Sequence, residues 1–318
     1  MLYTDAQDFP LSSELRAKAR ANGIELRFMD GHDREAMVAF GSDCAGVFLM
    51  FGYVDDKLLA RLPNWRILAR IGTGYDRIDV DAARRRGLMV TYVPDFSTDE
   101  LSNQVMMFVL AFARQLPYAM RAVSAHRWPP PTEFPVTDRL SEQSLGILGF
   151  GRSGQAVAKK ARGFGLRVLT WSRTPRPALC RRLNVEEVSF EQALACDYVS
   201  VHLPLTLQTT KLINRDSLRR LKKNAVLINI SRGGIVDTSA LVDVLSRGAI
   251  RGAGLDVVDP DPLPQDHPLW GLPNVLMTLH TGALSQAAQR VAVETAFDDA
   301  GRYLSGHKPL HPVPDLVP

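Results

Sequence analysis

Residues 144–154 read SLGILGFGRSG, and this stretch decides the fold. An apolar strand candidate, 144–148, leads into the spacing Gly-x-Gly-x-x-Gly, and a helix-forming run begins at Gln155. In this order the first glycine allows a tight turn, the second lets the backbone approach a pyrophosphate, and the third lets helix and strand pack closely. We therefore predict a dinucleotide-binding turn, with a purely structural turn as the alternative. The cofactor-binding residues predicted here are Gly149, Gly151, Arg152, Ser153 and Gly154.

Strand and helix candidates alternate on both sides of this turn. After it, we predict strands at 167–171, 198–203, 225–231, 253–258 and 275–280, and helices at 155–164, 190–195, 216–221 and 239–247. Before it, we predict strands at 46–51, 67–71 and 89–93, and helices at 12–22, 55–62 and 80–86. This alternation predicts an α/β fold in which each of two units has a doubly wound parallel sheet.

Two further segments connect these units. One long helix is predicted over 98–123, and Pro129, Pro130 and Pro131 then forbid regular structure and predict an extended arm. The arm is either a plain linker or a contact with another subunit. A final helix, 285–304, is expected to return to the N-terminal unit, which has few helices of its own to cover its sheet.

Composition narrows the class of protein. A chain of 318 residues, 46% hydrophobic and 23% charged, fits two globular domains and excludes disorder, collagen and coiled coil. The net charge of +4 comes from interspersed residues, so it suits an anionic ligand without requiring nucleic acid. Three separated cysteines predict reduced thiols rather than disulfides or a metal site. Without an N-terminal signal or a long apolar run, the chain is expected to be soluble, cytoplasmic and free of membrane.

The residues at the end of the strand after the glycine turn should determine whether the cofactor is NAD or NADP. About 20 residues past the turn, a carboxylate would bond the ribose 2′-hydroxyl, whereas an arginine beside small polar residues accommodates a 2′-phosphate. The sequence has Ser172, Arg173 and Thr174 there, with Arg176 close behind and no acid. We predict NADP as the cofactor, and NAD remains the alternative if Arg173 is only a surface charge.

Three further strand ends carry an arginine, acids and a histidine. They are Arg232 in INISRGGIVD, the acids of LDVVDPDP (255–262), and His280 in TLHTG. In a parallel sheet these ends emerge on the edge where a dinucleotide lies. Hydride transfer to a 2-oxo acid needs a cation for the carboxylate, a proton donor at the carbonyl, and a carboxylate that orients the imidazole. Each residue also has a structural alternative, but together they favour this chemistry.

At this point the chain resembles the D-isomer-specific 2-hydroxyacid dehydrogenases over nearly its whole length. The matching stretches are RIGTGYDRID (70–79), STDELSNQVMMFVLAFARQL (97–116), SLGILGFGRSG, YVSVHLPLTLQTTKLIN (198–214), INISRGGIVD, GAGLDV and PNVLMTLHTG. The resemblance implies a Rossmann coenzyme domain, 99–284, inserted into a flavodoxin-like substrate domain built from 1–98 and 285–318. It also implies an active site between these domains and a homodimer.

The resemblance assigns roles to individual residues. It makes His280 the acid/base and Arg232 the substrate-binding arginine, and it places Asp256 near the nicotinamide carboxamide. The backbone amides of the loop at Gly72, Thr73 and Gly74 would hold the substrate carboxylate. The remaining residues that it places at the cofactor are His202, Leu203, Pro204, Thr209, Ile230, Ser231 and Gly282.

One position departs from the family pattern in the catalytic group. The family has a glutamate just before a proline, and this sequence has Asp261 there, one methylene shorter. Asp261 would hold the imidazole only if its loop moves in, or else Asp259 or a water molecule would substitute, so we predict weaker orientation of His280. Leu279, where the family has proline, and Tyr92, where asparagine is common, also depart from the pattern.

The sequence thus predicts an NADP-preferring reductase of small 2-oxo acids, with glyoxylate or hydroxypyruvate preferred by analogy with the family. Two alternatives stay open. One is an NAD-dependent dehydrogenase of the phosphoglycerate type, which the absence of an acid at 172–174 and of an appended regulatory domain disfavours. The other is a nucleotide-sensing regulator of the corepressor type, which the lack of long extensions disfavours.

Overall fold

The computed structural model describes residues 1–29, 31 and 33–314, and the chain divides into two compact units. One unit joins Met1–Phe96 to Ser285–Pro318, and the other is Ser97–Leu284. The division after Phe96 comes two residues before the expected end of the first segment at 98, because Ser97 already precedes the first helix of the second unit. Residues 315–318, which the sequence assigns to the substrate domain, lie outside the described residues.

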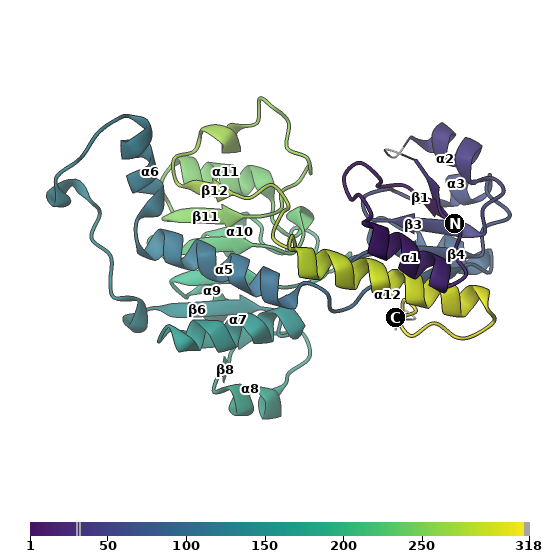
Figure 1. The fold of residues 1–318 in the computed structure, drawn as a ribbon. Coiled ribbons are helices and arrows are strands. Elements are labelled where there is room, and N and C mark those ends of the chain that lie inside the picture. The colour runs from purple at the N-terminus through teal and green to yellow at the C-terminus, as the bar shows by residue number, and fades with distance from the viewer. Residues whose placement is uncertain (30, 32, 315–318) are drawn as a thin grey trace. The chain divides into compact units, whose positions relative to one another are not determined.

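The unit made from both chain ends has a parallel sheet of order β2-β1-β3-β4-β5 (Figure 1). This is the strand order of flavodoxin-like folds. Its strands are β1 (Leu2–Tyr3), β2 (Arg27–Phe28), β3 (Gly46–Leu49), β4 (Ile67–Arg70) and β5 (Met89–Thr91). Its helices are α1 (Ser13–Ala21), α2 (Arg34–Gly41), α3 (Asp56–Leu59), α4 (Val80–Arg85) and α12 (Gln286–Leu304).

The C-terminal helix α12 belongs to this sheet. Phe297 of α12 meets Phe48 of β3 edge to face, with ring centroids 4.8 Å apart, and both side chains are fully buried. Helix α12 begins after Ser285, whose side chain accepts a hydrogen bond from Ala288 N, as a helix N-cap does. The chain therefore returns at its end to cover the sheet with which it began.

The second unit has a parallel sheet of order β12-β11-β10-β9-β6-β7-β8. With β6 counted as strand 1 and the sheet followed from β8 to β12, the order is 3-2-1-4-5-6-7. This is the doubly wound nucleotide-binding order 3-2-1-4-5-6 with one strand, β12, added at the end. Its strands are β6 (Ser144–Leu148), β7 (Arg167–Trp171), β8 (Glu186–Glu187), β9 (Tyr198–Val201), β10 (Val226–Asn229), β11 (Gly252–Leu255) and β12 (Val275–Met277). Its α-helices are α5 (Thr98–Ala113), α6 (Leu116–Ser124), α7 (Arg152–Gly163), α8 (Pro177–Leu183), α9 (Phe190–Leu194), α10 (Arg215–Leu218) and α11 (Thr238–Ser246).

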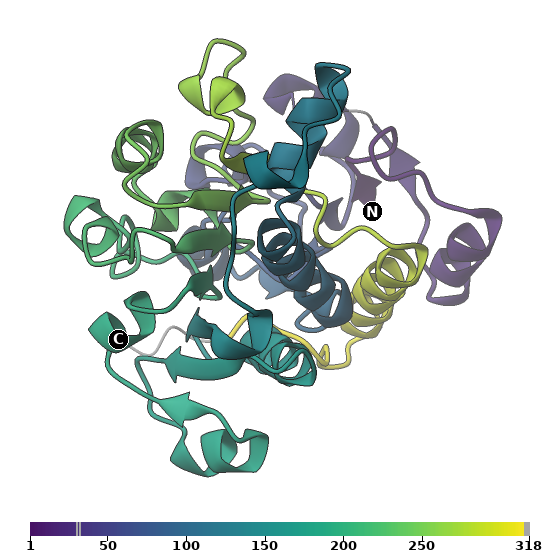
Figure 2. The same ribbon diagram turned by 90° about the vertical axis from the view of Figure 1, so that its left-hand side faces the viewer.

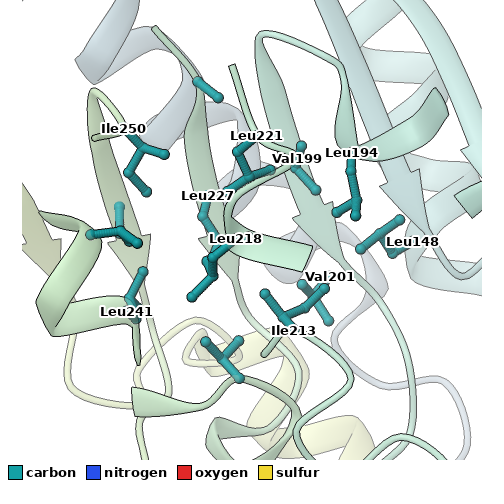
Figure 3. Packing of buried hydrophobic residues seen from close by; sticks show 14 of the residues in the cluster. Leu148, Leu194, Val199, Val201, Ile213, Leu218, Leu221, Leu227, Leu241 and Ile250 are labelled. Carbon is teal, nitrogen blue, oxygen red and sulfur yellow. The ribbon is translucent and has the colours of Figure 1, made fainter. Parts of the chain in front are cut away.

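Both faces of this second sheet are buried, because successive side chains of a strand point to opposite faces. On β10, Val226 and Ile228 enter the cluster formed with α5 and α7, whereas Leu227 enters the cluster formed with α9, α10 and α11. Figure 2 shows α5 and the green helices on opposite sides of the strands, and Figure 3 shows Leu227 among Leu218 and Leu241. Each such buried side chain contributes about 1.5–3 kcal/mol.

Several predicted elements differ in the structure. The single helix expected over 98–123 is two, α5 and α6, with Gln115 between them in the left-handed region at φ 57°. Pro117 explains the break, since proline is tolerated in the first turn of a helix but not in its interior. The proline arm also contains a short 3-10 helix, Pro131–Glu133, because a fixed proline φ suits the start of a helical turn.

The strands of the second unit end earlier than predicted at the functional edge. β9 ends at Val201, β10 at Asn229, β11 at Leu255 and β12 at Met277, so the motif residues that follow lie in turns. Helix α8 and strand β8 were not predicted from the sequence. For β8 the reason is that it is a short edge strand of two exposed glutamates without apolar alternation. Within the described part of the chain, no helix has the length and apolarity that a membrane span requires.

Candidate active site

The glycine turn between β6 and α7 has the geometry that close backbone packing requires. Gly149 has φ 101°, and a Cβ added to it would lie 2.5 Å from the carbonyl oxygen of His202. A Cβ on Gly154 would lie 2.3 Å from the carbonyl oxygen of Gly149, so helix and turn touch there. No described atom lies within 4 Å of a Cβ added to Gly151. The turn is therefore tight on the protein side and open at Gly151, as the approach of a pyrophosphate requires.

Helix α7 adds a positive pole to this turn. It begins at Arg152 after the N-cap Gly151, and no side chain of the described residues caps it. The first backbone N–H groups of such a helix remain available to a ligand, and the helix dipole favours an anion there. The residues present fit a dinucleotide pyrophosphate.

His202 joins the glycine turn to the neighbouring strand. Its Nδ1 lies 2.9 Å from Ser153 Oγ on α7, and its Nε2 lies 2.8 Å from Ser200 Oγ on β9. Burial lowers the pKa of His202 to about 3, because the protonated ring loses its hydration. His202 is therefore a neutral hydrogen-bond bridge under the turn. The sequence reading missed Ser200, whose only signal is a polar residue inside an apolar strand.

The strand β7 ends in a short polar turn at the predicted 2′-phosphate position. Ser172 Oγ donates to the carbonyl oxygen of Thr174 at 2.7 Å, so this hydroxyl shapes the turn. The side chains of Arg173 and Thr174 are exposed. One acid does lie close by in space, since Glu187 of β8 accepts from the backbone N–H of Arg176 at 2.6 Å. Glu187 was not predicted at this position because it lies on the next strand, β8, and not at the end of β7.

The loop after β9 holds its own shape. Thr209 Oγ1 donates to the carbonyl oxygen of Pro204 at 2.6 Å and accepts from the backbone N–H of Thr206 at 2.8 Å. A Cβ on Gly149 would also lie 3.0 Å from Leu203 Cδ2, so this loop closes over the glycine turn. Thr209 thus supports the loop, and Leu203 packs beside the turn.

A second turn after β10 presents Arg232. Asn229 is 1% exposed, its Nδ2 donates to the carbonyl oxygen of Arg232 at 2.8 Å, and its Oδ1 accepts from Ser231 N at 3.1 Å. A Cβ on Gly233 would lie 1.8 Å from the carbonyl oxygen of Val258. The arginine turn is therefore pressed against the segment that leads to Asp261. Sequence reading missed Asn229, although an asparagine at a strand end is a turn signal.

Two other residues predicted at the cofactor have structural contacts here. Ile230 is 5% exposed and packs in the core with α5 and α7, so only its backbone faces the edge of the sheet. Ser231 Oγ donates to the carbonyl oxygen of Val201 at 2.6 Å and so ties β9 to β10.

His280 and Asp261 meet directly. His280 Nδ1 lies 2.6 Å from Asp261 Oδ2, and the two side chains are 37% and 29% exposed. The shorter aspartate reaches the imidazole itself, with neither Asp259 nor a water molecule between them. An imidazole held at Nδ1 by a carboxylate is oriented with Nε2 outward, which suits proton donation and acceptance.

Asp256 is hydrogen-bonded to the turn that follows β12. It is 3% exposed, and its carboxylate accepts from the hydroxyl of Thr278 at 2.6 Å and from the backbone N–H groups of Thr281 and Gly282, both at 3.0 Å. A Cβ on Gly282 would lie 2.6 Å from Asp256 Oδ2. Asp256 thus holds the turn that carries His280.

All these turns follow the carboxyl ends of adjacent strands. The parallel registers pair β6 with β9, β9 with β10, β10 with β11, and β11 with β12. The glycine turn, His202, Arg232, Asp256 and His280 therefore emerge at one edge of a single sheet. Among the described residues no group of three or more metal-ligating side chains is found.

The predicted substrate loop lies in the other unit, after β4. Gly72 has φ 152°, Thr73 Oγ1 donates to the carbonyl oxygen of Val93 at 2.8 Å, and Arg70 Nε donates to the carbonyl oxygen of Gly74 at 2.8 Å. These bonds fix the loop from both sides. The shape of the loop is therefore set by residues of its own unit.

Comparison with known proteins places the chain in a family. The sequence pattern of the D-isomer specific 2-hydroxyacid dehydrogenase NAD binding domain matches residues 106–282. A glyoxylate reductase of Thermococcus litoralis is 37% identical over 278 residues, which are 85% of this chain and 82% of that one. A D-3-phosphoglycerate dehydrogenase of Mycobacterium bovis is 34% identical over 301 residues, 94% of this chain and 56% of that one, so the chain spans little more than half of that relative.

A solved structure agrees with the sequence comparison. The NADPH-dependent glyoxylate/hydroxypyruvate reductase of Sinorhizobium meliloti, solved with NADP and malonate, is 30% identical with a TM-score of 0.84, covering 98% of this chain and 96% of that one. Two doubly wound parallel sheets, the glycine turn and these similarities lead to one conclusion. The chain belongs to the D-isomer-specific 2-hydroxyacid dehydrogenase family and is an oxidoreductase that uses a nicotinamide cofactor and a 2-hydroxy or 2-oxo acid.

Proposed function

We propose that the protein is an NADP-preferring reductase of small 2-oxo acids, with glyoxylate or hydroxypyruvate as its substrate. The observation that carries this proposal is the His280–Asp261 pair, 2.6 Å apart, at the same sheet edge as the Arg232 turn and the glycine turn. The resemblance to glyoxylate reductases supports the choice of substrate. Cellular NADPH pools favour the direction of reduction.

The cofactor, when bound, supplies a hydride to C2 of the oxo acid. Protonated His280 donates its Nε2 proton to the forming hydroxyl, while the carboxylate of Asp261 holds Nδ1 and stabilises the imidazolium. Arg232 binds the substrate carboxylate in a bidentate manner, which its planar guanidinium suits. The family resemblance assigns substrate carboxylate binding also to the backbone N–H groups of the loop at Gly72–Gly74.

The cofactor preference rests on the turn after β7. Arg173 is exposed, and the residues beside it, Ser172 and Thr174, leave it room to face a 2′-phosphate. Glu187 on β8 accepts from the backbone N–H of Arg176 at 2.6 Å, so one oxygen of this nearby carboxylate is already engaged by a local bond. NADPH is therefore the preferred donor in this proposal, with NADH used less well.

We further propose a homodimer formed through α6 and the proline arm. Leu116, Met120 and Val123 of α6 are 45%, 52% and 62% exposed, and Trp128 and Val136 of the arm are each 99% exposed. Large apolar side chains gathered on one projecting segment are typical of an interface. Light scattering tests this directly, and a monomeric mass at micromolar concentration would contradict it.

The three cysteines are buried free thiols, which supports a reducing, cytoplasmic location.

The test of the proposed function is a steady-state comparison. Oxidation of NADPH and of NADH is followed at 340 nm with glyoxylate, hydroxypyruvate and longer 2-oxo acids. We expect the highest kcat/KM with NADPH and the two- and three-carbon acids. Tight cofactor binding without turnover of any acid would favour a nucleotide-sensing regulator, and selective use of NAD with 3-phosphoglycerate would favour a phosphoglycerate dehydrogenase.

A further inference from the structure

The turn that carries His280 has a backbone that few residues adopt. Thr281 N donates to the carbonyl oxygen of Thr278 at 3.2 Å and closes a four-residue turn. Its two central residues, Leu279 and His280, have φ values of 53° and 62°. Consecutive left-handed residues are typical of a type I′ turn, which favours glycine, asparagine or aspartate. A leucine and a histidine keep this conformation only where the surrounding contacts hold them there.

Asp256 holds the backbone of this turn at His280 and at the two residues that follow. Its backbone carbonyl oxygen accepts from His280 N at 2.6 Å, and its buried carboxylate accepts from Thr281 N and Gly282 N at 3.0 Å each. One residue at the end of β11 therefore fixes three successive backbone N–H groups. The direction of the imidazole depends on where that carboxylate lies.

Two side chains in turn hold the carboxylate. Thr278 Oγ1 donates to Asp256 Oδ1 at 2.6 Å, and Gln104 Nε2 donates to Thr278 Oγ1 at 2.6 Å. A hydroxyl has one proton, so the Thr278 oxygen that gives its proton to Asp256 is free to accept from the amide. Gln104 lies on α5, 174 residues earlier in the chain, and so links the turn to the longest helix of its unit.

We propose that Gln104 and Thr278 are positioning residues for His280. The relay from the Gln104 amide through the Thr278 hydroxyl to the Asp256 carboxylate keeps the Leu279–His280 turn left-handed and the imidazole within reach of Asp261. This inference rests on the proposed function, in which His280 is the proton donor. The relay acts on the turn of His280 and not on the glycine turn expected at the pyrophosphate. Its loss should therefore lower kcat by a larger factor than it weakens cofactor binding.

The experiment compares variants that remove or keep each donor. Thr278→Val replaces the hydroxyl with a methyl group of similar size, and Thr278→Ser keeps the hydroxyl. Gln104→Leu removes the amide. Asn103→Leu removes an amide at the preceding residue of α5, whose exposed side chain bonds Lys160 and Asp99. For each variant we would measure kcat and KM for the 2-oxo acid, the Kd of NADPH by fluorescence, and Tm.

We expect Thr278→Val to lower kcat about tenfold, within the roughly hundredfold that a misplaced catalytic group costs. The Kd of NADPH should change by a smaller factor than kcat, because the glycine turn is unchanged although Asp256 and Gly282 are expected at the cofactor. Thr278→Ser should recover most of the loss, Gln104→Leu should lower kcat by a smaller factor, and Asn103→Leu should match the wild type.

Other outcomes overturn the proposal in distinguishable ways. Wild-type kcat in both Thr278→Val and Gln104→Leu refutes the relay and leaves the proposed function standing. An equal loss in Thr278→Ser, or a loss of NADPH affinity as large as the loss of kcat, assigns these residues a general structural role and also refutes it. A wild-type protein that reduces no 2-oxo acid refutes the proposed function and this role together.

Discussion

The contact between Asp261 and His280 gives the sharpest prediction, for the substitution Asp261→Asn. Asparagine keeps the shape of the side chain and still accepts a hydrogen bond from Nδ1, so the change removes mainly the negative charge. Two unit charges about 4 Å apart attract by about 4 kcal/mol at an effective dielectric constant of about 20. The side chains of His280 and Asp261 are 37% and 29% exposed, so solvent screening must be subtracted.

Screening by roughly half leaves about 2 kcal/mol of stabilisation for the imidazolium in the pair. Because about 1.4 kcal/mol corresponds to a tenfold change in the population of the protonated imidazole, Asp261→Asn should lower kcat for reduction about 30-fold where that population limits the rate. The assay is kcat at saturating NADPH and 2-oxo acid. Asp266→Asn, an exposed acid later in the same loop, is the matched control and should keep the wild-type rate.

Two results would refute this reasoning. Wild-type kcat in Asp261→Asn would mean that the contact does not assist proton transfer. A large loss in Asp259→Asn with little loss in Asp261→Asn would mean that the other carboxylate of the segment supports the imidazole during turnover. Asp261→Glu, which restores the family residue, should keep activity if the loop adjusts to the added methylene.

Three further predictions concern other parts of the site. Arg232→Lys should raise KM for the 2-oxo acid at least about tenfold, because an ammonium group cannot form the bidentate pair; unchanged kinetics would contradict the clamp. Arg173→Ala should raise KM for NADPH about tenfold and leave KM for NADH nearly unchanged, and an equal effect on both would remove the 2′-phosphate role. The pKa of His202 is lowered to about 3, below the unfolded value of 6.5, so its contribution to stability is present above pH 6.5 and is lost as pH falls from there toward 3. His202→Gln should therefore lose less unfolding free energy than the wild type between pH 7 and pH 4 in urea melts, and a parallel loss would contradict this.

Much of the fold was predictable from local patterns. The glycine turn was predictable because the spacing of its glycines, and the strand and helix on either side, depend on backbone geometry within a few residues. The parallel sheets were predictable because strands buried on both faces are mainly apolar, as in Val226, Leu227 and Ile228 of β10. The charged edge strand Glu186–Glu187 lacks such a local signal and was missed. The break at Gln115 was missed although Pro117 marks it, because apolar residues at helical spacing precede it.

The individual contacts of the site needed the folded chain. Asp261 and His280 are 19 residues apart, and sequence alone left open whether the shorter acid, Asp259 or water would meet the imidazole. Likewise, an acid at Asp256 could be expected from the resemblance, but its partners could not. The hydrogen-bond relay from Gln104 is invisible in the sequence, since its two ends lie 174 residues apart.

The sequence by itself determined the family, the doubly wound architecture and the edge of the sheet that carries the chemistry, because these depend on periodicity and on glycine positions within short segments. Only the tertiary structure decided which carboxylate touches which donor. A hydrogen bond depends on atomic positions to within a few tenths of an ångström, and the packing of α5 and the strand-end turns sets those positions. The left-handed turn at Leu279 and His280 is the clearest case, since its two residues disfavour that conformation locally and long-range contacts impose it.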